Sequence, residues 1–131
     1  MYTIERTAFG FRITFAGTMD ERELREWAAD SRKALEEAPD EFGVLVDMRE
    51  LNLLSDDEQQ VMRAGQQHYQ DAGMVRSSVI LESAVLTLQF RRLAKESGIY
   101  EWERYINAGT TDDWHQQAVD WLTDGIDPDY Q

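Results

Sequence analysis

The chain contains no cysteine, which excludes disulfides, thiol catalysis and cysteine metal sites. It also lacks any apolar stretch of the roughly 18 to 20 residues that a membrane-spanning helix needs. Glu5 and Arg6 stand where a signal peptide would require an apolar run. We therefore expect a cytoplasmic protein with no integral membrane segment. No repeat, low-complexity segment or flexible linker divides the 131 residues, so a single domain is expected.

Positive charge is also scarce, with 13 basic against 26 acidic residues and a net charge of -13. Such a field repels phosphate backbones and anionic membranes, so nucleic acid is not expected as a partner. A solvated acidic surface is the simpler interpretation, and a site for a basic partner or a cation is the alternative. Lys33 and Lys95 are the only lysines. An acidic, lysine-poor surface suits a halophilic protein, because salt at about 1 M screens charge over roughly 3 Å and relieves self-repulsion.

Alternating apolar and polar residues in "YTIERTA" and "GFRITFAGT", with Gly10 between them, predict a β-hairpin. Strands and helices then alternate along the chain. We expect a helix between Thr18 and Pro39, a strand at 42–47, a helix at 56–72, a strand at 75–82, a helix from Ser83 to Gly98, a strand at 100–107 and a helix opened at Thr111. The predicted fold class is α/β in the order β-β-α-β-α-β-α-β-α, with a five-stranded, mixed, mostly parallel sheet and four helices.

Local signals refine the helices and the chain end. A T-x-x-E pattern from Thr18 to Glu21 predicts a capping box at the first helix, and an S-x-x-E pattern from Ser55 to Glu58 predicts another at the second. The apolar stripe expected to pack the third helix against the core consists of Val85, Leu86, Phe90, Leu93 and Ala94. The domain is expected to span residues 1–126, followed by an acidic, loosely held tail at 127–131.

This element order, together with three short stretches, resembles a known family. The stretches are "VLVDM" followed by a connection and a serine-led helix, "SSVILE", and "AVDWL" at residues 118–122. Together they resemble the SpoIIAA-like branch of the STAS (anti-sigma-factor antagonist) and Sec14-like proteins over nearly the whole chain. The resemblance implies a STAS-like fold and a non-catalytic regulatory or ligand-binding module that binds a protein partner or a small molecule. Some members of the family are switched by phosphorylation.

The phosphorylated serine of the antagonists lies in a D-S-S-G or D-S-x-G setting at the start of the helix after the third strand. This chain reads Ser55-Asp56-Asp57-Glu58 there. Ser55 falls on the aspartate of the motif, Asp56 on its serine, and Glu58 on its glycine. An acidic residue at the switch position can resemble a permanently phosphorylated state. Acids are equally typical of any first helical turn, because they favour the positive end of the helix dipole.

Candidate binding residues follow from where open α/β sheets usually bind, at the carboxyl ends of the parallel strands. They are Arg49, Ser55, Asp56, Asp57 and Ser83. No catalytic residue, metal site or cofactor is predicted, since the chain has no phosphate-binding or dinucleotide-binding glycine motif and its two histidines belong to no catalytic or metal pattern. Asp56 and Asp57 alone supply too few ligands for a hard cation. We therefore do not expect an enzyme.

A carrier of an apolar or lipid-like small molecule is the alternative function, suggested by the Sec14-like side of the resemblance. Four tryptophans could line such a site, although they are more typical of a core: Trp27, Trp102, Trp114 and Trp121. A carrier requires an enclosed apolar cavity of several hundred Å3, whereas a protein-binding module does not. We also expect a homodimer, with aromatic contacts supplied by Tyr100, Trp102 and Tyr105.

Overall fold

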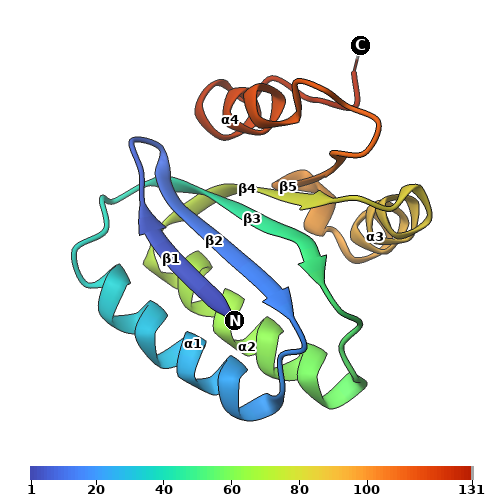
Figure 1. Ribbon diagram of the computed structural model, residues 1–131. Helices are drawn as coiled ribbons and strands as arrows, with labels where there is room; N and C mark the ends of the chain where they lie inside the picture. The colour runs from blue at the N-terminus through green and yellow to red at the C-terminus, as the bar shows by residue number, and fades with distance from the viewer. Residues whose placement is uncertain (131) are drawn as a thin grey trace.

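The computed structural model describes residues 1–130 and has the predicted order of elements (Figure 1). The strands are β1 (Tyr2–Arg6), β2 (Gly10–Gly17), β3 (Phe42–Leu51), β4 (Met74–Leu81) and β5 (Glu103–Asn107). The helices are α1 (Glu21–Leu35), α2 (Asp56–Ala72), α3 (Ala84–Ser97) and α4 (Trp114–Asp124), and a short 3-10 turn, η1, covers Ile99–Glu101. The predicted α/β fold with five strands and four helices is confirmed.

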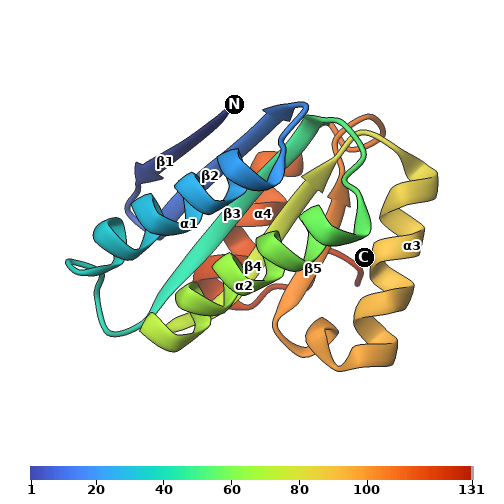
Figure 2. The same ribbon diagram turned by 90° about the horizontal axis from the view of Figure 1, so that it is seen from below.

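The sheet follows the chain order β1-β2-β3-β4-β5. β1 and β2 pair antiparallel as the predicted hairpin, and every later pair is parallel. Each parallel strand is joined to the next by a helix, and right-handed crossovers between strands in this order place the joining helices on the same face. Figure 2 shows α1 and α2 side by side across one face of the sheet, with α4 behind it and α3 beside β5.

Two cores lie on the two faces, because successive strand residues point to opposite sides. Val44 and Val46 of β3 belong to the larger core, which contains Trp27 of α1. Leu45 belongs to the smaller core, which contains Trp121 of α4. The buried strand residues therefore hold α4 against β3, β4 and β5 while the other helices cover the opposite face. No helix within residues 1–130 is long and apolar enough to cross a membrane.

Several predicted boundaries are wrong, including the start of the strand predicted at 100–107, where η1 forms and β5 begins only at Glu103, and two whose cause is clear. α1 is capped by Asp20, whose carboxylate accepts a 2.9 Å hydrogen bond from the backbone N–H of Glu23, whereas the hydroxyl of Thr18 accepts one from Asn52. An aspartate next to the first turn can satisfy a free N–H there, so the earlier threonine is not needed. β3 continues beyond Asp47 to Leu51, because a bulge shifts its register against β2 and lets the ladder resume.

The predicted apolar stripe of α3 is also wrong. Only Thr87 and Ala94 are fully buried along this helix, and Val85, Phe90 and Leu93 of the stripe are exposed. The reason is position: α3 flanks the β5 edge, packs on β5 and η1, and meets neither α1 nor α2 closely. Only a narrow strip of the α3 surface is in contact with the sheet, so most of the helix surface is exposed to solvent. Its 14 residues therefore offer a large uncommitted apolar surface.

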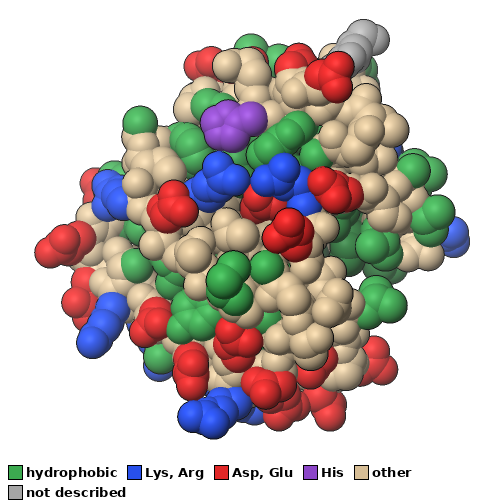
Figure 3. Space-filling view, in the orientation of Figure 1, with side chains coloured by type: hydrophobic (Ala, Val, Ile, Leu, Met, Phe, Trp, Pro, Cys, Tyr) green, Lys and Arg blue, Asp and Glu red, His purple; other side chains and the backbone are tan. Residues whose placement is uncertain are grey.

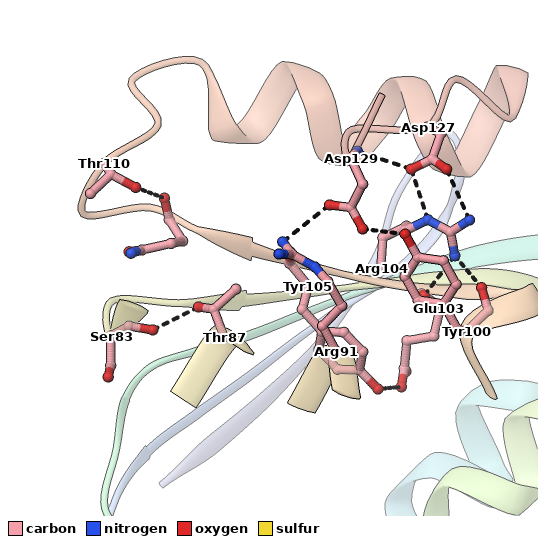
Figure 4. Close-up of polar contacts among 11 residues, drawn as sticks. Ser83, Thr87, Arg91, Tyr100, Glu103, Arg104, Tyr105, Thr110, Asp127 and Asp129 are labelled. Atoms are coloured by element: carbon pink, nitrogen blue, oxygen red, sulfur yellow. Dashed lines mark hydrogen bonds and ion pairs between the residues drawn. The ribbon is translucent and has the colours of Figure 1, made fainter. Parts of the chain in front are cut away.

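The chain end differs from the loosely held tail that we expected. Asp127 accepts two hydrogen bonds from Arg104, and Asp129 pairs with Arg91 (Figure 4). Acidic side chains near basic residues of β5 and α3 thus tie residues 127–129 to the body of the molecule. Gln131 lies outside the described residues.

Candidate functional site

At the carboxyl edge of the sheet, besides residues 18–20 after β2, lie three connections that follow β3, β4 and β5, at residues 52–55, 82–83 and 108–113. The first leads into α2 and the second into α3, so both carry helix beginnings. The backbone N–H of Gly109 donates to the Asn107 side chain, and an added Cβ there would lie 3.3 Å from the carbonyl oxygen of Glu82. The second and third connections are therefore in contact.

Ser55 is the N-cap of α2 in a complete capping box. Its hydroxyl accepts a 3.2 Å hydrogen bond from the backbone N–H of Glu58, and the Glu58 carboxylate accepts a 2.8 Å bond from the backbone N–H of Ser55. Two of the N–H groups that every helix leaves free at its start are thereby satisfied. The predicted cap is confirmed, and the hydroxyl has a structural role.

Replacing Ser55 by alanine is expected to lower the free energy of unfolding by about 0.5–2 kcal/mol, because the N–H of Glu58 loses its acceptor. Aspartate at the same position should retain most of the stability, since its carboxylate can accept the same bond. Urea denaturation of the wild type, S55A and S55D measures the difference. An S55A protein as stable as the wild type, or an S55D protein as unstable as S55A, would contradict the capping role.

The other candidate residues do not form one cluster. Asp56 and Asp57 occupy the exposed first turn of α2, on the same face of the sheet as α1. Ser83 caps α3 by accepting a 3.2 Å hydrogen bond from the backbone N–H of Leu86. Arg49 lies on the opposite face of the sheet, where its guanidinium stands 4.6 Å over the ring of Trp114 in α4. The five residues therefore contribute to two separate regions.

Arg49 belongs to a polar cluster that sequence reasoning missed, in which the buried carboxylate of Asp47 bridges two arginines. Arg49 donates from Nε and Nη2 to the two Asp47 oxygens at 3.0 and 2.8 Å, and Arg12 donates at 3.1 Å. The bulge in β3 helps, because the backbone N–H of Arg49 also reaches Asp47. Burial raises the pKa of Asp47, but hydrogen bonds and charge from Arg49, together with Arg12, outweigh it and hold the pKa below its ordinary value. The only signal in the sequence was an aspartate at the end of an apolar run.

Exposed apolar side chains mark the carboxyl edge on the side of α2 and α3. Leu53 is 86% exposed in the connection before α2, and Val85 and Leu88 are 64% and 61% exposed in the first turns of α3. Figure 3 shows hydrophobic side chains gathered on the α3 side of the molecule, at the right, and acidic side chains along the lower edge, over the beginnings of α1 and α2. Leu53 and Leu88 were not predicted as surface residues.

Two hollows stand out within residues 1–130, and both are open and lined in large part by polar side chains. A groove of about 460 Å3 lies between α1 and α2, with Arg25, Asp57 and His68 among its lining residues. A hollow of about 290 Å3 lies between α3, the end of β5, α4 and the chain end, with Arg91 and Asp129 among its lining residues.

The two histidines lie apart from each other. His68 on α2 accepts a 3.1 Å hydrogen bond from Arg32 on α1, and His115 on α4 packs edge-on against Trp114. Within residues 1–130, no group of three or more histidine or acidic side chains is placed to hold a metal ion.

Comparison with known proteins identifies solved structures with a similar fold. No family model and no curated protein matches the sequence. The phosphorylated form of SpoIIAA, a cell fate determinant of Bacillus, aligns with a TM-score of 0.59 and 15% identity over 91% of this chain and 99% of that one. The unphosphorylated form of the anti-sigma factor antagonist SpoIIAA aligns with a TM-score of 0.57 and 13% identity, over 91% and 96%.

A third solved structure is an uncharacterized protein of the DUF3478 family from Shewanella loihica PV-4, described as having a SpoIIAA-like fold. It aligns with a TM-score of 0.64 and 19% identity over 93% of this chain and 92% of that one. All three likenesses extend over almost the entire length of both partners, and all three are to structures with this one architecture. The chain therefore has the SpoIIAA-like fold.

Proposed function

We propose that the protein is a non-catalytic regulatory module that binds a protein partner through its carboxyl edge. The binding surface, called here the edge surface, consists of Leu53, Asp56, Asp57, Val85 and Leu88, with Ser55 and Ser83 holding the two helix beginnings in place. The observation that carries the proposal is the exposure of Leu53, Val85 and Leu88 on segments that follow two neighbouring parallel strands. Large apolar side chains exposed on neighbouring segments at one edge of a sheet are candidate contacts for a partner.

Charge defines the chemistry of the partner. The first turn of α2 carries Asp56, Asp57 and Glu58, and the chain as a whole has a net charge of -13. Arg49, the cation that precedes Leu53 in the sequence, is engaged with Asp47 on the other face of the sheet. The complementary partner is therefore a protein surface with an apolar centre and basic residues at its rim. The SpoIIAA-like fold supports the regulatory class, because one protein that has it is described as an anti-sigma factor antagonist.

The carrier alternative depends on an enclosed apolar cavity. Neither hollow supports it, since both are open and have charged residues such as Arg25 or Arg91 in their walls. Trp27 and Trp121 are buried within the two cores, and Trp114 packs at the margin of the smaller one. These tryptophans contribute to packing, so the partner-binding proposal is the better supported of the two.

The proposal is tested with a photoactivatable residue at position 53, which captures the partner in the native cells, followed by calorimetry with that purified protein. Replacing both Leu53 and Val85 by serine should raise the dissociation constant about tenfold or more, because full burial of each side chain against a partner would stabilise the complex by about 1.5–3 kcal/mol. V75S is the matched control, since Val75 is exposed at the amino end of β4, away from the edge surface. Affinity should also fall with salt. A double variant that binds as tightly as the wild type would reject the proposal.

A further inference from the structure

Two arginines hold the chain end, and they are used very differently. The Arg104 side chain is only 8% exposed and lies between the rings of Tyr100 and Trp121, at 3.6 and 4.2 Å from their centroids. Its Nε and Nη2 donate to Asp127 at 2.8 and 3.1 Å, and its Nη1 donates to the backbone carbonyls of Tyr100 and Glu103. Each of its three nitrogens has an acceptor, so Arg104 is a structural clamp.

The N–H donors of Arg91 are less completely paired than those of Arg104. Its Nη2 pairs with Asp129 Oδ1 at 3.1 Å and makes a long 3.4 Å contact with the carbonyl of Tyr105. Its Nε is buried and donates to no residue in the described part of the chain. A buried donor without an acceptor is uncommon in folded proteins. The Arg91 side chain as a whole is 29% exposed, and Arg91 is one of the residues that line the smaller hollow.

The hollow of about 290 Å3 lies directly at Arg91 (Figure 4). Ala84, Leu88 and Ile106 give it an apolar side, and Asn107 and Thr110 give it a polar one. α3 begins at this hollow and has no acidic residue in its first turn, so the positive end of the helix dipole is uncompensated there. Its volume of about 290 Å3 lies just below the roughly 300–1,000 Å3 typical of pockets for drug-sized ligands.

The last wall of the hollow is the chain end itself, contributed by Pro128 and Asp129. Asp129 presents a carboxylate to Arg91 with one oxygen, and its other oxygen accepts a hydrogen bond from the hydroxyl of Tyr100 (Figure 4). Because Asp127 is fixed by Arg104, Asp129 can leave Arg91 without release of the preceding residues. The structure thus places an intramolecular carboxylate at an arginine that borders a ligand-sized hollow.

We propose that this hollow binds a small organic acid with one carboxylate and a short apolar body, and that Asp129 is its intramolecular competitor. The carboxylate of the ligand accepts hydrogen bonds from both Nε and Nη2 of Arg91, the two-point geometry that arginine offers to carboxylates. Asp129 makes only a single contact with Arg91 and does not use this geometry. The apolar body packs against Leu88 and Ile106. Asp129 moves aside and turns to solvent when the ligand enters.

Nuclear magnetic resonance titration of the full chain tests the proposal, with butyrate and benzoate as probes and their uncharged amides as matched controls. The acids should shift the Arg91 Nε–H resonance and the amides should not. D129N should lower the dissociation constant about threefold or more, because apparent affinity is reduced by the fraction of molecules whose site is free. D124N removes the same charge from an exposed position on α4 and should leave the constant unchanged.

R91Q should abolish binding, and R91K provides a second variant that keeps the charge but loses the two-point geometry. Spectra of each variant without ligand establish that it is folded. Loss of binding in folded R91Q, with tighter binding in D129N, supports the site. The proposal is overturned if neither acid binds at 50-fold excess over millimolar protein or if R91Q binds as the wild type does. It is equally overturned if D129N behaves like D124N, or if inorganic phosphate binds while both acids fail.

Discussion

Replacing Gly65 by alanine is expected to lower the free energy of unfolding by about 1–3 kcal/mol, although alanine is the better helix former. Gly65 lies in the middle of α2 and faces α1. A Cβ at this position would lie 2.2 Å from Cζ3 of Trp27, far inside van der Waals contact. Trp27 is fully buried, edge-on to Phe15 at 5.0 Å and stacked on Tyr69 at 6.1 Å, so its ring has no room to retreat. α1 and α2 would have to separate.

Urea denaturation measures this loss, and two further variants establish its cause. A64G, at the neighbouring exposed position, should lower the free energy of unfolding by about 1 kcal/mol through helix propensity alone. G65A would raise it by the same amount if nothing blocked the new methyl group. Replacing Trp27 by leucine destabilises the protein by itself but removes the atoms that clash. The cost of G65A should therefore nearly disappear in the W27L background. A G65A protein at least as stable as the wild type would show that the contact between the helices is not tight.

The order of the elements could be predicted from the sequence because each strand and helix carries its own signal. The alternation around Gly10, the apolar run before Asp47 and the capping box at Ser55 are local patterns, and the structure confirms the hairpin, the buried β3 and the start of α2. Right-handed crossovers then leave little freedom in how strands joined by helices can be arranged.

The packing of individual faces was less predictable. Leu93 and Ala94 have similar places in the apolar pattern of α3, yet only Ala94 is buried, because this helix meets the sheet at its edge. A periodic apolar pattern does not show whether a broad face of the helix or only a narrow strip of it will be buried. Tyr105, expected among the contacts of a homodimer, is likewise buried in the core beneath α3. Self-association and adaptation to concentrated salt stay predictions.

The polar clusters were the least predictable part, because they join residues that are distant in sequence. Arg12 and Asp47 meet only because β2 and β3 are parallel neighbours in this register. Arg91 meets Asp129 only because the chain after α4 returns to residues of β5 and α3 (Figure 4). Single arginines on strands or helices carry no sign of such partners. The candidate residue Arg49 was expected in the connection after the strand but lies within β3, and the bulge that directs it to Asp47 has no local signature.

Replacing Asp47 by asparagine is expected to lower the free energy of unfolding by about 2–3 kcal/mol at pH 7. Asparagine keeps the shape of the side chain but removes the charge that the two guanidinium groups share. Its amide N–H groups would face the N–H donors of the arginines, so no hydrogen bond could form there. Breaking a fully buried ion pair costs roughly 3–5 kcal/mol. The arginines here are 28% and 31% exposed, so solvent screens part of the repulsion that remains between them. D112N, at an exposed position in the connection before α4, removes the same charge and should change stability little.

The pH dependence of this difference separates the charge of Asp47 from its shape. Because the folded pKa is lowered below the unfolded value of about 3.9, the folded state binds fewer protons there, and the ionised carboxylate stabilises the fold fully above about pH 5. The stabilisation declines as the pH falls through the unfolded pKa toward the folded one. Unfolding free energies of the wild type and D47N should therefore differ most at pH 7 and 5 and converge below pH 4, whereas those of D112N should follow the wild type throughout. A gap that stays constant down to pH 3 would mean that lost packing, and not the bridge between Arg12 and Arg49, explains the cost.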